Sequence, residues 1–222
     1  MSTFLQLVQE LHREVGAAGT APSAVTGQVG EAARMVNWVI SADYYIQMLW
    51  HNWKFLKHAT GFSVSTVAST ATLAKPTSHH FWDMETFKID GGPLAAVEYE
   101  VMKADVLSTT EAQPGRVIIM PDNSLKFDPI PDDAYLITAD YYLQPTKLAA
   151  NADVSAIPLT YHQVILGRAM QLYANYEDAA EAKRQGTEIY DEFIQRLQDH
   201  QLPSQEYSQF KSTGNFIEVI AS

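Results

Sequence analysis

The stretch that decides the fold is QVGEAARMVNWVISADYYIQMLWHNWKFLK, residues 28–57. Its apolar residues recur at alternating intervals of three and four, which places them on one face of an α-helix. This stripe consists of Ala32, Met35, Val39, Ala42, Ile46, Leu49, Trp53 and Leu56. Its flanks are Val36, Ile40, Tyr45 and Trp50. Because the face is wider than a two-stranded coiled-coil seam, we expect a long core helix packed against more than one other helix.

Both ends of this predicted helix carry capping signals. Thr26 is placed to cap the first-turn amides, and Glu31 lies near the positive end of the helix dipole. At the other end, Lys57 and His58 lie near the negative end of the dipole, and Gly61 is a typical stop.

Composition indicates an ordinary globular protein. The 222 residues are 46% hydrophobic and 18% charged, enough for one sizeable domain or a domain with an insertion. The absence of cysteine excludes disulfides, thiolate nucleophiles and cysteine metal sites. Neither a signal-peptide pattern nor an apolar run of about 18 residues is present. We therefore expect a soluble protein that is made in the cytoplasm and has no membrane partner.

Charge is distributed unevenly along the chain. The net charge is −11, and the residues from Asp83 to Asp153 hold thirteen acidic side chains against five basic ones. Lysine and arginine form no cluster anywhere in the sequence. Because binding to a phosphate backbone needs such a basic surface, the sequence argues against a nucleic-acid-binding function.

Helical patterns occur before and after a central extended region. Residues 3–15 predict a short first helix, and two more helices are expected at 158–176 and 178–203. Each of these last two begins with a capping-box signature, Thr160 with Gln163 and Asp178 with Glu181. The predicted bundle core consists of Met35, Val39, Ile46, Leu49, Trp53, Leu172 and Phe193.

Between these helices the hydrophobic period changes to two, which is typical of strands. The predicted strands are 62–66, 70–73, 86–89, 96–101, 116–120, 124–127 and 134–143, with a brief helix at 102–107. The fold class is therefore α+β: a four-helix bundle with an inserted antiparallel β-domain and an extended C-terminal tail. The expected boundaries are 1–59 and 149–203 for the helices, 60–148 for the β-domain and 204–222 for the tail.

The tail, SQEYSQFKSTGNFIEVIAS, is a polar segment that ends in an apolar pentapeptide. Such a segment is too short to bury itself, so we expect it to be disordered in the free monomer and extended against a partner. The residues expected to make this contact are Phe210, Phe216, Ile217, Val219 and Ile220.

Residue patterns for catalysis are missing from the sequence. His51 and His58 lie two helical turns apart in the predicted helix, which is too far for one metal ion. His79 and His80 are adjacent in a predicted solvated loop, where they would point apart. We therefore predict no catalytic residue, metal site or cofactor. An acid–base or metal hydrolase is the alternative, which metal analysis with a hydrolase screen would reveal.

Aromatic residues are unusually numerous for a small helical core. Trp38, Trp50 and Tyr44 are candidates for a subunit interface, where Trp and Tyr commonly anchor contacts. Core packing is the alternative interpretation of the same residues.

Several blocks together resemble the phage head-to-tail adaptor proteins, also called connector or head-completion proteins. The blocks are FLQLVQELHREVG, TGQVGEAARMVNWV, HNWKFLK, PDNSLKFDPIPDDAYLITADYYLQP, YANYEDA and DHQLP, within residues 3–203. The stretch LAKPTSHHFWDM, residues 73–84, departs from the family pattern.

The resemblance implies a structural virion protein without enzymatic activity, located at the head–tail interface. It implies a ring of twelve copies beneath a dodecameric portal, with a C-terminal tail that reaches into crevices of the portal ring. The implied partners are the portal protein, neighbouring copies, and tail or nozzle proteins, and DNA only passes through the channel at ejection. The alternative is another tail-completion or tail-side ring protein that does not bind the portal directly.

Overall fold

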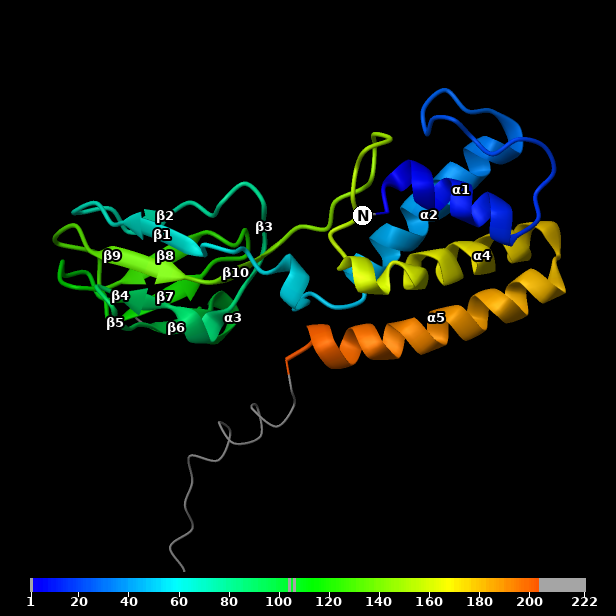
Figure 1. The fold of residues 1–222 in the computed structure, drawn as a ribbon. Coiled ribbons are helices and arrows are strands. Elements are labelled where there is room, and N and C mark those ends of the chain that lie inside the picture. Colours follow the sequence, from blue (N-terminus) through cyan, green and yellow to red (C-terminus); the bar gives the residue numbers. More distant parts are fainter. Residues whose placement is uncertain (1, 104, 106, 204–222) are drawn as a thin grey trace, which may run out of the picture. The chain divides into compact units, whose positions relative to one another are not determined.

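The computed structural model describes residues 2–103, 105 and 107–203, which belong to two compact units (Figure 1). The helical unit runs up to Phe55 and resumes at Pro145, and the β unit spans Leu56–Gln144. The described chain is thus a mixed α+β protein with several antiparallel strand pairs and five α-helices, as the sequence predicts at the level of fold class.

The helical unit contains α1 (Phe4–Glu14), α2 (Gly30–Met48), α4 (Gln163–Glu177) and α5 (Ala180–Gln201). Helix α4 contacts each of the other three helices, and α1 also contacts α2. The first helix begins as its sequence predicts, because Thr3 and Gln6 form a reciprocal capping box. Its apolar face, from Phe4 to Leu11, is buried.

Helix α2 is shorter than the sequence predicts: it ends at Met48, not at Lys57. The indole N–H of Trp53 donates to the backbone carbonyl of Ile46 at 3.0 Å, a bond that the chain can make only after it has turned back. Trp53 is thereby fully buried, whereas Leu49, expected in the core, is a half-buried C-cap residue. Thr26 does not cap the helix, which starts after Val29 without a side-chain cap.

The predicted break between the last two helices is present, but its chemistry differs from the prediction. Asp178 ends α4 in the left-handed conformation, with φ of 54°, instead of capping α5. Likewise, α4 follows a 3-10 turn at Leu159–Tyr161 and starts without a side-chain cap, so the capping box expected at Thr160 does not form. The residue before α4 is the buried His162, whose ring Nε2 bonds with the carbonyl oxygen of Ile157 at 2.9 Å.

Two glycines allow α4 and α5 to approach closely. A Cβ atom at Gly167 would lie 2.7 Å from the backbone nitrogen of Tyr190 and 2.9 Å from the carbonyl oxygen of Gly186. A Cβ atom at Gly186 would lie 2.8 Å from Cβ of Met170. These distances are shorter than van der Waals contact, so the helix pair depends on both residues lacking a side chain.

The β unit contains three small sheets, with strand orders β1-β9-β4-β5, β10-β3 and β2-β8-β7-β6. The strands are β1 (Phe62–Ser65), β2 (Thr72–Leu73), β3 (His79–Trp82), β4 (Lys88–Ile89), β5 (Gly92–Pro93), β6 (Ala95–Glu98), β7 (Arg116–Ile119), β8 (Leu125–Asp128), β9 (Leu136–Ala139) and β10 (Tyr141–Leu143). The predicted hairpin is β7 with β8, in which Asn123 takes a positive φ of 64°. One hydrophobic core, which includes Phe62, Trp82 and Ile137, joins the sheets.

Three features of the β unit correct the sequence prediction. Strand β6 pairs with β7 in parallel, so the unit is not wholly antiparallel. The brief helix lies earlier than expected, as α3 (Tyr99–Met102), and shortens the strand predicted at 96–101. His79 and His80 lie in strand β3 instead of a solvated loop, with His79 buried and His80 exposed.

The chain enters and leaves the β unit side by side. Lys57 forms an antiparallel bridge with Tyr142, and the backbone N–H of His58 donates to the carbonyl oxygen of Tyr141 at 2.9 Å. Residues paired in this way have Cα atoms about 5 Å apart. A few residues are therefore long enough to join the two chain segments at this point.

We predict that Gly167→Ala destabilises the protein by about 1–3 kcal/mol, because the added methyl group overpacks the contact between α4 and α5. This loss opposes and exceeds the gain of up to about 1 kcal/mol that alanine normally brings to a helix. Urea unfolding followed by circular dichroism measures the change. Gly115→Ala is the control, since its Cβ meets no atom within 4 Å. An equally stable Gly167→Ala variant would contradict the close packing.

We also predict that the helical unit folds without the β unit. A short Gly/Ser bridge from His58 to Tyr141 should preserve the helical circular dichroism signal and a cooperative thermal transition. The physical reason is that each unit has a buried core of its own. Loss of the helical signal after this deletion would instead indicate one integrated core.

Candidate functional site

Two hollows, one on each unit, are lined mainly by apolar and aromatic side chains. The first is a groove of about 310 Å³ on the outer side of α2, lined by Ile40, Ser41, Tyr44, Tyr45, Met48 and Lys147, which we call the α2 surface. Met48 is 57% exposed and Tyr45 is 42% exposed. The helical period explains the groove, since Ile40, Tyr44 and Met48 follow one another at intervals of four.

Cationic side chains lie over the aromatic rings of the α2 surface. Nζ of Lys147 is 5.0 Å from the ring centre of Tyr44, and the guanidinium carbon of Arg168 is 4.5 Å from that of Tyr45. Such cation–π contacts are worth about 0.5–1 kcal/mol each at exposed positions. They hold the two rings in place, so the groove is formed before any partner arrives.

A buried polar cluster beneath the α2 surface positions Lys147. The Asp43 carboxylate is fully buried and accepts hydrogen bonds from the Ser155 hydroxyl at 2.5 Å and from the Gln47 amide at 2.8 Å. Gln47 also exchanges two hydrogen bonds of 3.1 Å with the backbone of Thr146. The segment that carries Lys147 is therefore tied to α2 on both sides.

Burial raises the pKa of Asp43 to about 6, and the hydrogen bonds from Ser155 and Gln47 only partly oppose this effect. The sequence does not predict this buried cluster, because Asp43 is a polar residue next to the apolar stripe and would be expected at the surface. The spacing of four between Asp43 and Gln47 is the only local signal that they can bond.

The residues predicted for a subunit interface differ in their surroundings. Trp50 is 45% exposed, and Tyr44 is half-buried in the α2 surface. Trp38 packs within the helical unit, with its ring centre 5.6 Å from that of Tyr173 and 5.8 Å from that of Tyr176. Much of the Trp38 ring is thus occupied by contacts between α2 and α4.

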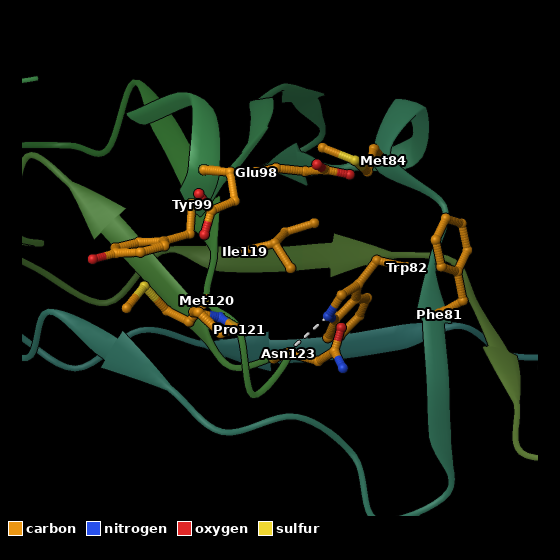
Figure 2. A pocket seen from close by; sticks show the side chains of 10 residues that line it. Phe81, Trp82, Met84, Glu98, Tyr99, Ile119, Met120, Pro121 and Asn123 are labelled. Atoms are coloured by element: carbon orange, nitrogen blue, oxygen red, sulfur yellow. Dashed lines mark hydrogen bonds between the residues drawn. The ribbon is translucent and has the colours of Figure 1, made fainter. Parts of the chain in front are cut away.

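The second surface is a hollow of about 230 Å³ in the β unit, which we call the β hollow (Figure 2). It is lined by Phe81, Trp82, Met84, Glu98, Tyr99, Glu100, Ile119, Met120, Pro121 and Asn123. Figure 2 shows Ile119 between Phe81 and Trp82 on one side and Glu98 and Tyr99 on the other. The indole N–H of Trp82 donates to the backbone carbonyl of Asn123 at 3.0 Å, which fixes the wall of the hollow.

The edge of the β hollow carries charge. Glu98 is exposed, and within the described part of the chain it has no ion-pair partner, whereas Glu100 pairs with Lys103. A second hollow of about 200 Å³ shares Tyr99 and Met120 with the first. Its charged lining residues are Lys103, which pairs with Glu100, Asp105, which pairs with Arg116, and Lys126, for which the described part of the chain shows no ion pair. The two hollows thus form adjacent sites whose available charges have opposite signs.

His79 lies behind the β hollow, where it packs against Trp82 and Tyr141 with ring centres 4.3 Å and 5.7 Å apart. Burial lowers the pKa of His79 to about 4, so the ring is neutral at pH 7. His79 therefore acts as a neutral ring that packs in the aromatic core of the β unit. Within the described residues, no group of three or more His, Cys, Asp or Glu side chains is arranged to hold a metal ion.

The remaining residues named from the sequence lie in the helical unit or outside the described part. Met35, Val39, Ile46 and Trp53 are buried, and Leu49, Leu172 and Phe193 are half-buried. Phe210, Phe216, Ile217, Val219 and Ile220 lie outside the described residues. Among the helices that are described, none has both the length and the apolar character needed to cross a membrane.

Comparison with known protein families places the chain in one class, the structural adaptors. Over residues 2–212 it matches the family described as SU10 adaptor protein. The chain belongs to this family, which agrees with the resemblance to phage head-to-tail adaptors and implies a non-enzymatic, structural component of the virion. No curated protein matches the chain.

We predict that Asp43→Asn removes a pH dependence of stability. Because the folded pKa of Asp43 is about 6 and its ordinary value is 3.8, protonated Asp43 favours the folded state. Its contribution is complete below the unfolded pKa and is lost as the pH rises through 6. Asparagine is neutral throughout: its Oδ1 can still accept from the Gln47 amide, whereas its Nδ2 can only donate, to the hydroxyl oxygen of Ser155.

The stability of the Asp43→Asn variant relative to the original chain should therefore rise by about 2 kcal/mol between pH 4 and pH 7.5. Urea unfolding at several pH values measures this difference. The control is Asp199→Asn, at an exposed position on α5. A pH-independent difference for Asp43→Asn would show that the carboxylate is not desolvated.

Proposed function

We propose that this protein is a head-to-tail adaptor whose copies form a ring that binds the portal and provides the attachment platform for the tail. The observation that supports this proposal is the family match, which covers both units of the chain. We propose twelve copies, to match a dodecameric portal, with tail or nozzle proteins bound on the opposite side of the ring. The four helices of the helical unit would form its connector core.

The α2 surface is the proposed contact between neighbouring copies. Its groove combines aliphatic and aromatic side chains, and the exposed Trp50 follows its Met48 by two residues in the sequence. Trp and Tyr are enriched in such contacts because each buries a large area while few rotatable bonds become fixed.

The negative charge of the chain suits a channel through which DNA passes without binding. The net charge is −11, and the β unit holds most of the acidic excess. A basic wall would instead retain the phosphate backbone by releasing its counterions. DNA is therefore a proposed passenger of the ring during ejection and not a ligand.

The C-terminal tail is proposed to reach the portal or a neighbouring copy. Four of its residues, Phe216, Ile217, Val219 and Ile220, are apolar and follow a polar spacer. In an extended chain these side chains alternate between two faces, so a crevice or a sheet edge can hold both. Many tails around a ring add avidity that one tail lacks.

Electron microscopy of the purified protein mixed with purified portal tests this function. We predict rings docked to the portal in the absence of any tail protein. Rings that bind only tail proteins would favour a tail-side component instead. Truncation after Gln209 should weaken portal docking and tail attachment, while the helical circular dichroism signal stays unchanged. Docking of the truncated protein at full strength would show that the tail has no part in assembly.

A further inference from the structure

We infer that the β hollow is the receptor for the C-terminal tail of a neighbouring copy, with Phe210 as the anchor and Lys211 paired with Glu98. This inference rests on the assembly of several copies proposed above. It assigns a partner to a surface of the β unit that neither the core nor the family match explains.

The β hollow has the apolar walls that an anchor side chain needs. Ile119, Met120 and Tyr99 lie along one stretch of it, and Phe81 and Trp82 close the other side (Figure 2). Phe81 remains 38% exposed, and its ring centre lies 6.5 Å from that of Tyr142. Because Trp82 is held by its hydrogen bond to Asn123, the hollow is preformed, and binding loses little conformational entropy.

The size of the hollow favours a peptide side chain over a small molecule. Its volume is about 230 Å³, whereas pockets for drug-sized ligands and cofactors usually range from about 300 to 1,000 Å³. A single aromatic residue inserted from an extended chain is a better match. The remaining contacts of such a chain would run over the neighbouring hollow.

The charges beside the hollows define the peptide further. Two glutamates line the hollow. Glu100 is paired with Lys103, whereas Glu98 has no ion-pair partner among the described residues. Lys126 lines the second hollow, beyond Tyr99 and Met120. The ligand should therefore carry a cation beside its aromatic anchor, and an anion beside a second apolar group.

The tail has this order of residues. Phe210 is followed directly by Lys211, and Phe216 and Ile217 are followed by Glu218. An aromatic residue followed by lysine occurs at two other places in the chain, Trp53 and Phe87, and both of these aromatic side chains are buried.

The tail is also long enough to leave its own copy. Phe210 lies seven positions after Pro203, and an extended chain spans about 3.3 Å per residue, or roughly 23 Å in total. Each copy in a closed ring would donate one tail and receive one. A weak contact repeated around the ring is enough to stabilise it, because each bound tail raises the effective concentration of its neighbours.

Photo-crosslinking in the full-length chain tests this inference. Benzoylphenylalanine replaces Phe210, and unlabelled and nitrogen-15-labelled copies are mixed before irradiation. We expect crosslinks between copies of different label, and mass spectrometry should map them to the walls of the β hollow at residues 81–84, 98–100 and 119–123. Crosslinks that map to the α2 surface, or only within one copy, would overturn the inference.

Charge reversal provides the specific control. Glu98→Lys and Lys211→Glu should each lower the yield of these crosslinks at least about fivefold, which corresponds to the loss of one charge-assisted contact. The two substitutions together should restore most of the yield. Glu111→Lys, at another exposed position of the β unit, should leave it unchanged. An equal yield in all four variants would show that Glu98 does not receive Lys211.

The same samples separate this inference from the proposed function. Ring formation and portal docking are measured by electron microscopy before irradiation. Rings that dock normally but give no crosslink at the β hollow would overturn only the assignment of the tail. Copies that form neither rings nor crosslinks between labels would overturn both.

Discussion

The buried carboxylate of Asp43 is the interaction on which the geometry of the helical unit depends. Its partner Ser155 belongs to the segment through which the chain returns from the β unit to α4. A carboxylate at this depth is tolerated only because its oxygens are hydrogen-bonded, so this segment cannot leave α2 without exposing an unsatisfied charge. The same segment places Lys147 over Tyr44. One buried group therefore fixes both the path of the chain and the shape of the α2 surface.

Elements with a strong local signal could be predicted from the sequence. The signals for the first helix, its apolar period and its N-terminal cap, lie close together in the sequence. In the structure Thr3 caps the helix and Leu11 is buried, as predicted. The end of α2 could not be predicted in this way, since the period continues to Leu56 although the helix stops at Met48. After Met48 the chain turns back, and the indole N–H of Trp53 donates to the carbonyl oxygen of Ile46. This tertiary hydrogen bond outweighs the helical period of the sequence at that point.

The candidate sites depended even more on contacts that are distant in sequence. The β hollow combines residues of β3, α3 and the turn after β7, and no local pattern joins Phe81 with Tyr99 or Asn123. Likewise, the sequence shows two adjacent histidines but cannot show that one of them fills a space between Trp82 and Tyr141. The number of aromatic residues indicated that an interaction surface exists. Which rings lie in the core and which lie at the surface could be decided only from the three-dimensional structure.

The division into two units has a consequence for an adaptor. Each unit has a hydrophobic core of its own, so the α2 surface and the β hollow are supported by different sets of buried residues. A substitution that alters one surface should leave the other able to bind, because sites without shared contacts act nearly independently. If both proposed contacts form, one chain would bind a neighbour through its helices and a peptide through its sheets at the same time. In the proposed ring both surfaces would join neighbouring copies, so each contact would raise the avidity of the other.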